Sequence, residues 1–427
     1  MTKLFMVSFE GMNYDILLNW IDKSYLKNFQ RILREGCLDK IECGRIPYEA
    51  AGLTSIFSGL KDSEHGICSY WKAQNNNYVP EIWSSDEIKD YMFWQKKDYE
   101  ENSFNIVNVF GTHPAYQING NMISYCMHNS LRYTYPSTLK MDLLKSGYSY
   151  IQDTGAFFKN QSKEKFLNKV LEIDSLRYNA GKELVKNNPD ISIINFTCID
   201  RLSHFYMNEL RENMVPLKDT AIFQAYKKCD EILGDILNCV EKNNADLILF
   251  SSVGFGHLKN FVEVNNYLAE KGLLKWYSAR VPDWNHTVAF EAPQGCHGIN
   301  INKKSFYTNG IISDSDYTEV LHEVMDQLRI MRNPYNDNPM FSNVVLGKDF
   351  YKNDTNVPDI IIEPYDWEYL PYGDSYWADK VMRHYQTGWH RKSTVWGGLG
   401  PNISPKEKLT NITDFVPLIN RIMKKFK

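Results

Sequence analysis

The chain has 427 residues, of which 43% are hydrophobic and 14% aromatic, and its formal net charge is −4. This composition supplies enough apolar material for a large core and excludes an intrinsically disordered chain. The weak negative charge and the lack of a Lys/Arg-rich run argue against a nucleic-acid partner. No apolar stretch of the sequence is long enough to cross a bilayer, so we expect no membrane association.

The N-terminal segment predicts a strand rather than a targeting signal. Residues Leu4–Phe9 are largely apolar, and the run ends at Glu10 without a small-residue cleavage site. The eight cysteines are scattered and contain no CxxC pair, which is typical of reduced, buried thiols. We therefore expect a cytoplasmic protein.

Four short apolar runs predict buried strands. They are Leu4–Phe9, Phe104–Phe110, Ile191–Phe196 and Leu247–Phe250. Between the last two, apolar residues from Ile222 to Val240 follow a helical period, and Lys227, Asp230 and Glu241 fall largely off that face. A strand, a helix and a strand in this order predict a parallel sheet with crossover connections.

Two polar, aromatic segments, near 72–101 and 118–164, are predicted insertions that cap a site. In open α/β sheets the ligands bind at the carboxyl ends of the strands, where Glu10, Asp200 and Ser252 follow the apolar runs. His204 lies four residues after Asp200, a spacing that can place both side chains on one helix face as metal ligands. By itself this spacing is a weak signal, and a capping Asp and a packed His explain it better than a metal site does.

Seven segments in chain order resemble the type I phosphodiesterase and nucleotide-pyrophosphatase branch of the alkaline-phosphatase superfamily. They read VSFEGM, IPYEAAGLTSIFSGLKDSEHGI, FTCIDRLSHFY, LILFSSVGFG, DWNHTVAFEAPQGCHGININ, VPDIIIEP and TGWHRKSTVWGGLGPNI. The resemblance covers the chain almost end to end. It implies an α/β, alkaline-phosphatase-like sandwich, in which helices flank a central, mostly parallel sheet, as a single domain over 1–427 with cap insertions.

The resemblance also implies a metal site. The family binds two metals, and the ligands of its first metal fall on Asp200, His204 and His390. A carboxylate and two imidazoles are ordinary zinc ligands, and three protein ligands leave one coordination position open. We expect one bound divalent metal, with zinc as the first choice and manganese or iron as alternatives.

The second metal site is where this sequence departs from the family. Glu10 replaces the family's Asp after the first strand, Glu49 replaces the Thr or Ser nucleophile, and Ser252-Val253 replaces an Asp-His pair. Val253 cannot bind a metal, so we expect the second site to be lost. Glu49 and Glu10 are the predicted catalytic residues. Glu49 could be a metal ligand, a general base or a remnant, of which the first two are favoured.

One cation facing Glu10, Glu49 and Asp200 would give a site with a net charge of about −1, which repels a phosphorylated substrate. Arg201, Lys259 and Arg391 flank the matching segments and are the predicted substrate-binding cations. The alternative, that they are solvated surface cations, stays open.

Together these features predict an atypical single-metal hydrolase, phosphodiesterase-like, that acts on a small phosphoester or nucleotide-like compound with metal-activated water. Two alternatives stay open, because a fold alone does not define a reaction. One is a catalytically inactive binding or scaffold pseudoenzyme, which the loss of the nucleophile favours. The other is a remodelled transferase or lyase of a biosynthetic pathway. The sequence does not define an oligomeric state.

Overall fold

The computed structural model describes residues 1–427 except 153–161, 213–215, 279, 353–355, 374–384 and 427. The chain forms two compact units, which are described separately. The first unit contains Met1–Leu60, Ser84–Gly256 and Thr387–Lys427, and the second contains Lys61–Trp83 and His257–Gln386. The predicted insertion 118–164 lies in the first unit, whereas 72–101 contributes to both. The prediction of a single domain with two cap insertions stays a prediction.

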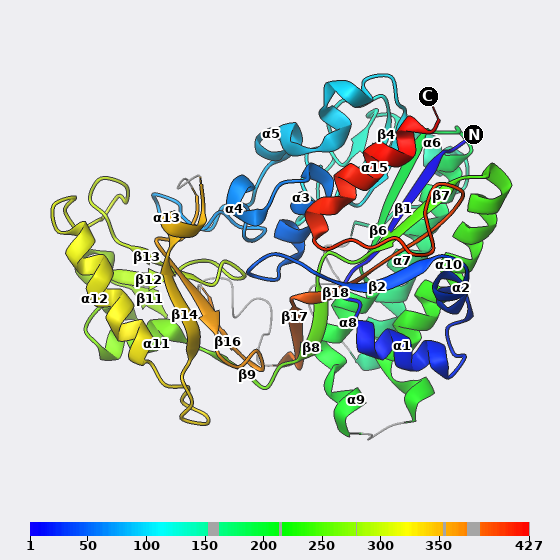
Figure 1. The fold of residues 1–427 in the computed structure, drawn as a ribbon. Coiled ribbons are helices and arrows are strands. Elements are labelled where there is room, and N and C mark those ends of the chain that lie inside the picture. Colours follow the sequence, from blue (N-terminus) through cyan, green and yellow to red (C-terminus); the bar gives the residue numbers. More distant parts are fainter. Residues whose placement is uncertain (153–161, 213–215, 279, 353–355, 374–384, 427) are drawn as a thin grey trace. The chain divides into compact units, whose positions relative to one another are not determined.

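The first unit is built on an eight-stranded sheet with the order β2-β18-β7-β1-β6-β3-β4-β5 (Figure 1). The five neighbours from β7 to β4 run parallel, whereas β18 is antiparallel to both of its neighbours and β5 to β4. This confirms the predicted α/β class with a central, mostly parallel sheet. The strands, in sheet order, are Cys37–Glu42, Ser393–Leu399, Asp246–Phe250, Leu4–Phe9, Ile191–Phe196, Phe104–Val107, Gly120–Ile123 and Thr134–Tyr135.

The four predicted strands are present in the structure, and two of their ends differ from the prediction. β1 and β6 have the predicted bounds, and β7 begins one residue earlier, at Asp246. β3 ends at Val107 instead of Phe110. Asn108 has a φ of +62°, a left-handed conformation that cannot continue a strand. The apolar run to Phe110 therefore continues as a buried turn rather than as a strand.

Helices cover both faces of this sheet (Figure 1). Adjacent residues of a strand point to opposite faces, so Leu249 of β7 joins one core cluster while Phe250 faces the other way. Residues of α1, α2, α7, α8 and α10 form the cluster around Leu249. On the other face, Phe250 packs against Phe57 of α3 and Phe415 of α15. These helices are Tyr14–Asp22, Lys27–Glu35, Lys163–Val185, Cys198–Tyr206, Ala221–Asn243, Glu49–Ser58 and Phe415–Lys424.

Helix α10 shows why the predicted helical segment folds as it does. Thr220 caps its N-terminus, because the hydroxyl accepts from the backbone N–H of Phe223 at 3.3 Å. The predicted apolar face from Ile222 to Val240 is buried. Asp230 was expected off this face, but it is buried too. Its carboxylate accepts the backbone N–H groups of Asn28 and Phe29, which otherwise have no cap at the start of α2.

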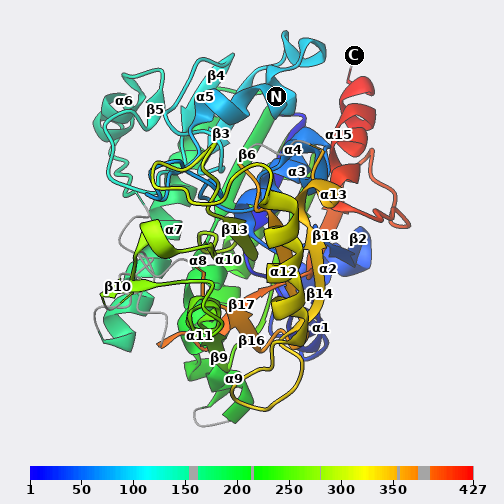
Figure 2. The same ribbon diagram turned by 90° about the vertical axis from the view of Figure 1, so that its left-hand side faces the viewer.

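The second unit has its own four-stranded antiparallel sheet, with the order β12-β13-β15-β14, and two smaller strand pairs, β9 with β16 and β10 with β11. Helix α12 (Tyr317–Ile330) packs against β14, as both views show (Figures 1 and 2). Leu321, Val324 and Leu328 of α12 join a separate core cluster. The strands β9 to β16 are Asn260–Val262, Trp276–Ser278, Val281–Pro282, Ala289–Glu291, Gly298–Ile301, Phe341–Leu346, Ile360–Pro364 and Tyr369–Pro371.

Several short helices and strands complete the two units. They are the helices α4 (Asp62–His65), α5 (Ser85–Ile88), α6 (Leu139–Lys145), α9 (Asn208–Glu212), α11 (Val264–Glu270) and α13 (Gly347–Phe350), and the strands β8 (Gly254–His257) and β17 (Gly388–Arg391).

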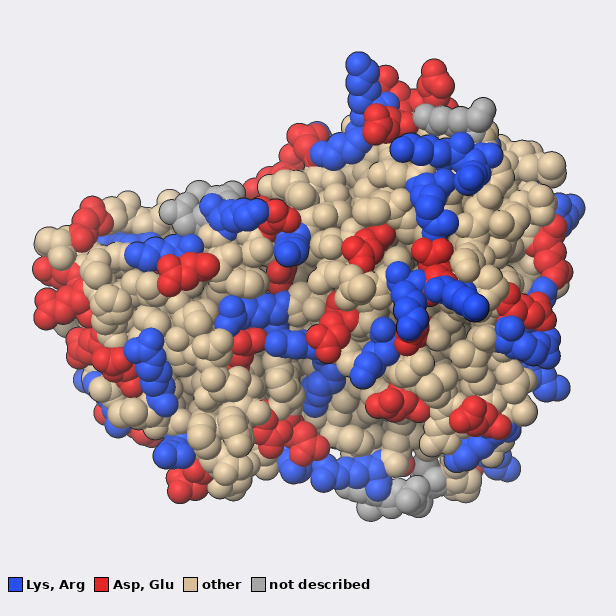
Figure 3. Space-filling view, in the orientation of Figure 1, with Lys and Arg blue, Asp and Glu red and all other residues tan. Residues whose placement is uncertain are grey.

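The surface charges and the cysteines are distributed as in ordinary folded proteins. Lys and Arg are interspersed with Asp and Glu over the face drawn in Figure 3. Within the described ranges, none of the helices combines the length and the apolarity that a bilayer span requires. All eight cysteines are free thiols, and seven of them are buried.

Candidate metal centre

The metal centre is built on helix α8, which starts just after the carboxyl end of β6. Asp174, from the neighbouring helix α7, accepts the backbone N–H groups of Thr197 at 3.1 Å and Cys198 at 2.7 Å. This carboxylate caps the N-terminus of α8 and is itself paired with the buried Arg177. Asp200 and His204 lie one turn apart on the helix held in this way, so they share a face.

Strand β17 brings the third residue, His390, to the same place. Gly388 packs so tightly on α8 that a Cβ at this position would lie 2.4 Å from the carbonyl oxygen of Ser203. The backbone N–H of Thr387 donates to the carbonyl of His204 at 2.7 Å. A glycine is therefore needed where the strand meets the helix. This contact places His390, two residues after Gly388, next to Asp200.

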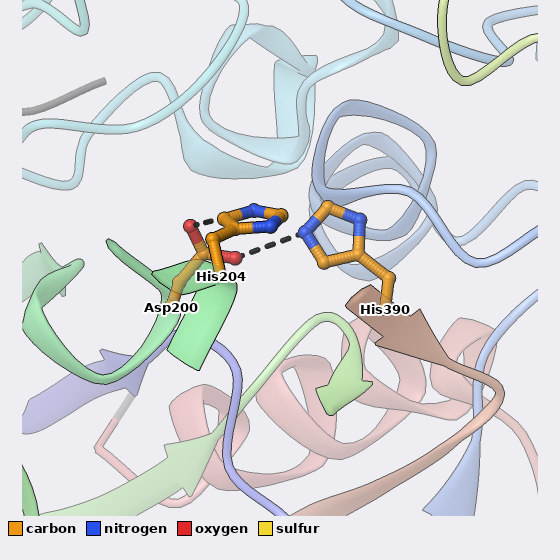
Figure 4. Close-up of side chains that lie close together, drawn as sticks. All are labelled: Asp200, His204 and His390. Carbon is orange, nitrogen blue, oxygen red and sulfur yellow. Dashed lines mark hydrogen bonds and ion pairs between the residues drawn. The ribbon is translucent and has the colours of Figure 1, made fainter. Parts of the chain in front are cut away.

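Asp200, His204 and His390 converge, and we call them the metal cluster (Figure 4). One potential ligand atom from each lies within 4.8 Å of the others. Oδ1 of Asp200 is 2.9 Å from Nε2 of His390, and Oδ2 is 3.6 Å from Nε2 of His204. Nδ1 of His204 lies 3.3 Å from the carbonyl oxygen of Gly388. A proton on Nδ1 would donate to this carbonyl and leave Nε2 as the ligand atom, which is the usual second-shell arrangement of a metal-binding histidine.

The protonation states also suit a cation. Burial lowers the pKa of His204 to about 3, so the imidazole is neutral, as a metal ligand must be. Burial alone would raise the pKa of Asp200, but the charges of His204 and Arg201 and the hydrogen bond from His390 outweigh it and lower the pKa. The guanidinium of Arg201 is charged at every pH of interest, so it helps to keep this carboxylate ionised where His204 is neutral.

Glu10, Ser252 and Val253, which are predicted to occupy the family's second-metal positions, form a set that we call the closed corner. Glu10 is fully buried. Its Oε1 accepts from the hydroxyl of Ser8, and its Oε2 accepts from the backbone N–H and the hydroxyl of Ser252 at 3.1 and 2.5 Å. Burial, followed by the nearby charge of Glu49, raises the pKa of Glu10 to about 8.

The side chain of Val253, in the same corner, cannot bind a metal. Val253 is fully buried, and its carbonyl accepts from the hydroxyl of Ser251 at 2.6 Å. The same hydroxyl accepts the backbone N–H of Gly11 at 2.9 Å. Gly11 has a φ of +84°, and a Cβ there would lie 2.8 Å from Cα of Asp200. The end of β1 is thus hydrogen-bonded to the segment that follows β7 and packs closely against α8.

Arg201 lies beside the metal cluster, between Asp200 and Glu49. Its side chain is 4% exposed, and Nη1 contacts Oδ2 of Asp200 and lies 3.9 Å from Oε2 of Glu49. Its Nη2 donates to the hydroxyl of Tyr125 at 2.9 Å. The guanidinium therefore places a permanent positive charge between two carboxylates of the site. Of the three predicted substrate-binding cations, Arg201 is the one that the structure brings to the metal cluster.

Glu49 is the first residue of α3 and is 1% exposed. A carboxylate is favoured at this end of the helix by the helix dipole. The preceding residue, Tyr48, packs edge-on against His390 with ring centroids 5.4 Å apart. Glu49 is thus placed beside the metal cluster, and its described ion-pair neighbour there is Arg201.

The two other predicted substrate-binding cations, Arg391 and Lys259, make contacts with other parts of the protein. Nη1 of Arg391 donates to the carbonyls of Trp389 and His390 at 3.1 and 2.9 Å, so this guanidinium braces the strand that carries His390. Lys259 belongs to the second unit, where it pairs with Glu368 at 2.5 Å and borders a cavity of about 800 Å³. Substrate binding by either residue stays a prediction.

Sequence reasoning missed several residues that shape the site, namely Ser8, Tyr125, Asp174 and Ser251. Ser8 could have been found, because it lies two residues before Glu10 on the same side of an extended strand. Tyr125 gives no such signal, since it lies far from Arg201 in the sequence and in a segment without a matching motif.

A sheet with an Asp/His cluster at the carboxyl ends of its strands is the arrangement of the alkaline-phosphatase superfamily, and comparison with known proteins agrees. The type I phosphodiesterase / nucleotide pyrophosphatase family model matches residues 4–391, and the chain belongs to this family. Members of this family are metal-dependent hydrolases of the phosphodiesterase/pyrophosphatase type. A search of curated protein sequences gave no match.

Several solved structures share the fold. Human ectonucleotide pyrophosphatase / phosphodiesterase 5 is 15% identical, with a TM-score of 0.58. Phosphonoacetate hydrolase from Sinorhizobium meliloti 1021 is 13% identical, with a TM-score of 0.61. Alkaline phosphatase PafA is 14% identical, with a TM-score of 0.56. In each case the match covers 99% of this chain and 95% of the other. These similarities show the alkaline-phosphatase-like fold.

Proposed function

We propose that this protein is a single-metal hydrolase that cleaves a small phosphoester or nucleotide-like compound. The observation that carries the proposal is the metal cluster, in which ligand atoms of Asp200, His204 and His390 lie within 4.8 Å of one another. The carbonyl of Gly388 supports it, because it orients the ring of His204. A divalent cation, with zinc as the first choice, would supply Lewis acidity and positive charge there when bound.

Arg201 provides the positive charge that the family takes from its second metal. The raised pKa of Glu10 leaves this residue mostly protonated at pH 7, so a divalent cation and the guanidinium of Arg201 would face the carboxylates of Asp200 and Glu49 with a net charge of about +1 before substrate binds. A guanidinium also presents several N–H donors in a plane, which suits the oxygens of a phosphoryl group. Arg201 is held by Asp200 and Tyr125, so its position does not depend on the substrate.

Glu49 is the general base in this proposal. It is buried beside Arg201, and it occupies the position of the family's hydroxyl nucleophile. A carboxylate there accepts the proton of an attacking water, whereas a hydroxyl would attack the phosphorus itself. The hydroxyl and backbone N–H of Ser252 already hydrogen-bond to Glu10, which makes Glu10 the weaker candidate for this role.

The substrate class is inferred from relatives. A murine ectonucleotide pyrophosphatase / phosphodiesterase 5 variant was solved with AMP, and the phosphonoacetate hydrolase with phosphonoacetate. Both ligands are small and carry a phosphorus-bound anion. We therefore favour a small phosphorylated compound, and a diester or anhydride over a monoester, because a monoester dianion needs more positive charge than one cation and one guanidinium supply.

The test is hydrolysis of bis(p-nitrophenyl) phosphate and p-nitrophenyl phosphate by protein loaded with zinc, manganese or iron. We expect metal-dependent turnover of the diester, weak turnover of the monoester, and loss of both in Asp200→Ala. His286→Ala, which changes an exposed histidine of the second unit, is the matched control and should keep wild-type activity. Rapid monoester turnover that requires Asp200 would contradict the charge argument.

The competing function is a binding protein without turnover. Its specific support is the loss of the family's hydroxyl nucleophile at Glu49 together with the closed corner. A protein that contains one metal per chain, binds AMP, and hydrolyses neither nitrophenyl ester nor AMP anhydrides would favour this function over the hydrolase.

A further inference from the structure

The second unit contains a cavity of about 250 Å³ on one face of its four-stranded sheet. Phe290 of β12 and Asn300 of β13 lie directly opposite each other in this antiparallel pair, so their side chains share a face, and both border the cavity. Their neighbours Ile299 and Ile301 point to the other face and join the core cluster of the unit. The cavity therefore lies on the opposite face of these two strands from Ile299 and Ile301, and its aromatic lining, which includes Phe290 and Tyr307, extends the core of the unit.

Aromatic rings form one wall of this cavity. Tyr78 lies between Trp284 and Tyr307 in a three-ring stack, with centroid distances of 3.9 Å and 5.0 Å. The ring of Phe290 meets all three edge-on, at 4.9 to 5.8 Å. Tyr78 has a φ of +64°, an unusual conformation for a residue with a large side chain. Its hydroxyl donates to Oδ1 of Asn302 at 2.8 Å, which helps to fix the stack.

Two buried polar atoms of the lining have no hydrogen-bond partner among the described residues. They are Oδ1 of Asn300 and the hydroxyl of Tyr307, whose side chains belong to residues that are 1% and 3% exposed. Nδ2 of Asn300 donates to the carbonyl of Ala73 at 2.7 Å, which fixes the carboxamide and leaves Oδ1 as an acceptor. Unsatisfied acceptors at this depth are costly, and a bound molecule with N–H or O–H donors would satisfy them.

The charged residues near the cavity already have partners. Glu291 accepts the backbone N–H groups of Gly373 at 3.0 Å and Asn265 at 3.4 Å. Arg280 pairs with Glu263 at 2.8 Å. With both charges engaged, the cavity favours an uncharged ligand. Asn77 and Val79 at its edge are exposed, so the cavity is accessible to a small molecule.

We propose that the second unit binds a small, uncharged ring compound, a nucleoside or a monosaccharide, in this cavity. The flat or ring-shaped body packs against the aromatic wall, and its N–H or O–H groups donate to Asn300 and bond with Tyr307. Both compound classes share this chemistry. The site consists only of residues of the second unit and does not depend on the proposed hydrolase activity.

The test is calorimetric and ligand-observed NMR titration of the full chain with adenosine, uridine and methyl glucoside. Tyr307→Phe removes only the hydroxyl, and it should weaken binding by roughly three- to tenfold while leaving the unfolding temperature of the free protein unchanged. Asn300→Leu should weaken binding further. Tyr277→Phe, at an 81% exposed tyrosine of the same unit, is the matched control. Asp200→Ala should leave the affinity as in wild type.

The outcome with each compound also identifies the ligand class. Binding of the nucleosides or of the glucoside, with the expected loss in the Tyr307 and Asn300 variants, supports the site and decides between the two classes. No binding of any of the three at millimolar concentration overturns the proposal. Binding that is insensitive to both variants, or that is lost in Asp200→Ala, also overturns it, because the ligand would then lie elsewhere.

Discussion

The metal cluster and the closed corner both lie at strand ends of the first unit, but they use their polar atoms in opposite ways. In the metal cluster, three potential ligand atoms face one another, and the carbonyl of Gly388 orients the ring of His204. In the closed corner, both oxygens of Glu10 accept hydrogen bonds from Ser8 and Ser252. Hydrogen bonds within the protein thus occupy the atoms that would otherwise bind a second cation.

This comparison favours a second site that is replaced rather than merely depleted. Three substitutions relative to the family fit together, since the carboxylate of Glu10 is matched by Ser252 and the hydrophobic Val253 is buried beside them. Arg201 restores one positive charge from inside the protein. A set of mutually compatible groups is expected of a remodelled site, whereas random loss would leave buried polar groups without partners.

The largest expected effect tests the metal cluster itself. Purified protein should contain about one divalent metal per chain, and Asp200→Ala should reduce metal affinity by more than about a hundredfold, because it removes a ligand outright. Elemental analysis after dialysis measures this. Ser252→Ala changes the closed corner instead and should leave the metal content at about one. Two metals per chain in wild-type protein would show that the corner is not closed.

The next effect concerns Glu49. Glu49→Gln keeps the volume of the side chain but cannot accept a proton, so turnover should fall by about a hundredfold at normal metal content. A lower metal content would instead identify Glu49 as a ligand, because amides bind zinc poorly. Glu49→Thr rebuilds the family's nucleophile but should not restore monoesterase activity while Ser252 and Val253 remain. Wild-type rate and metal content in Glu49→Gln would remove Glu49 from the mechanism.

Removing the guanidinium of Arg201 should lower catalytic efficiency by a smaller factor, and the same change at Arg391 should not. Arg201→Met removes the guanidinium beside Asp200, and kcat/KM for an anionic diester should fall by about tenfold or more, with metal content unchanged. Arg201→Lys keeps the charge but not the planar donors, and its loss should be intermediate. Arg391→Met is the comparison variant, since Nη1 of this residue donates to backbone carbonyls. Equal losses in both Met variants would contradict the assignment of Arg201 as the second positive charge.

Much of this arrangement could be predicted from the sequence, because it depends on local patterns. The buried strands, the α10 face and the i, i+4 pair of Asp200 and His204 follow from periodicity and spacing. His390 required the family resemblance, since 186 positions separate it from His204 and only the packing of Gly388 on α8 brings the two together. The hydrogen bond between Tyr125 and Arg201 has no counterpart in any local pattern. Nor does the division of the chain into two units, which depends on long-range contacts.

The last expected effect is on the stability of metal-free protein, and it tests how the closed corner is protonated. The pKa of Glu10 is raised from 4.5 to about 8, mainly by burial and next by the charge of Glu49. The folded state therefore binds a proton more tightly than the unfolded state. The resulting stabilisation is complete below pH 4.5 and is lost as the pH rises towards 8.

Glu10→Gln should remove this pH dependence. The amide resembles a protonated carboxyl, because it can donate to Ser8 and still accept from the backbone N–H and hydroxyl of Ser252. Near pH 5, wild type and variant should be similarly stable, whereas near pH 8 the variant should be more stable than wild type by several kcal/mol, since each pH unit in this range costs wild type about 1.4 kcal/mol. Urea unfolding of chelator-treated protein at the two pH values measures the difference. A variant that is less stable than wild type at pH 8 would show that Glu10 is ionised in the folded protein and needed there as an anion, and the closed corner would then be open to a second cation.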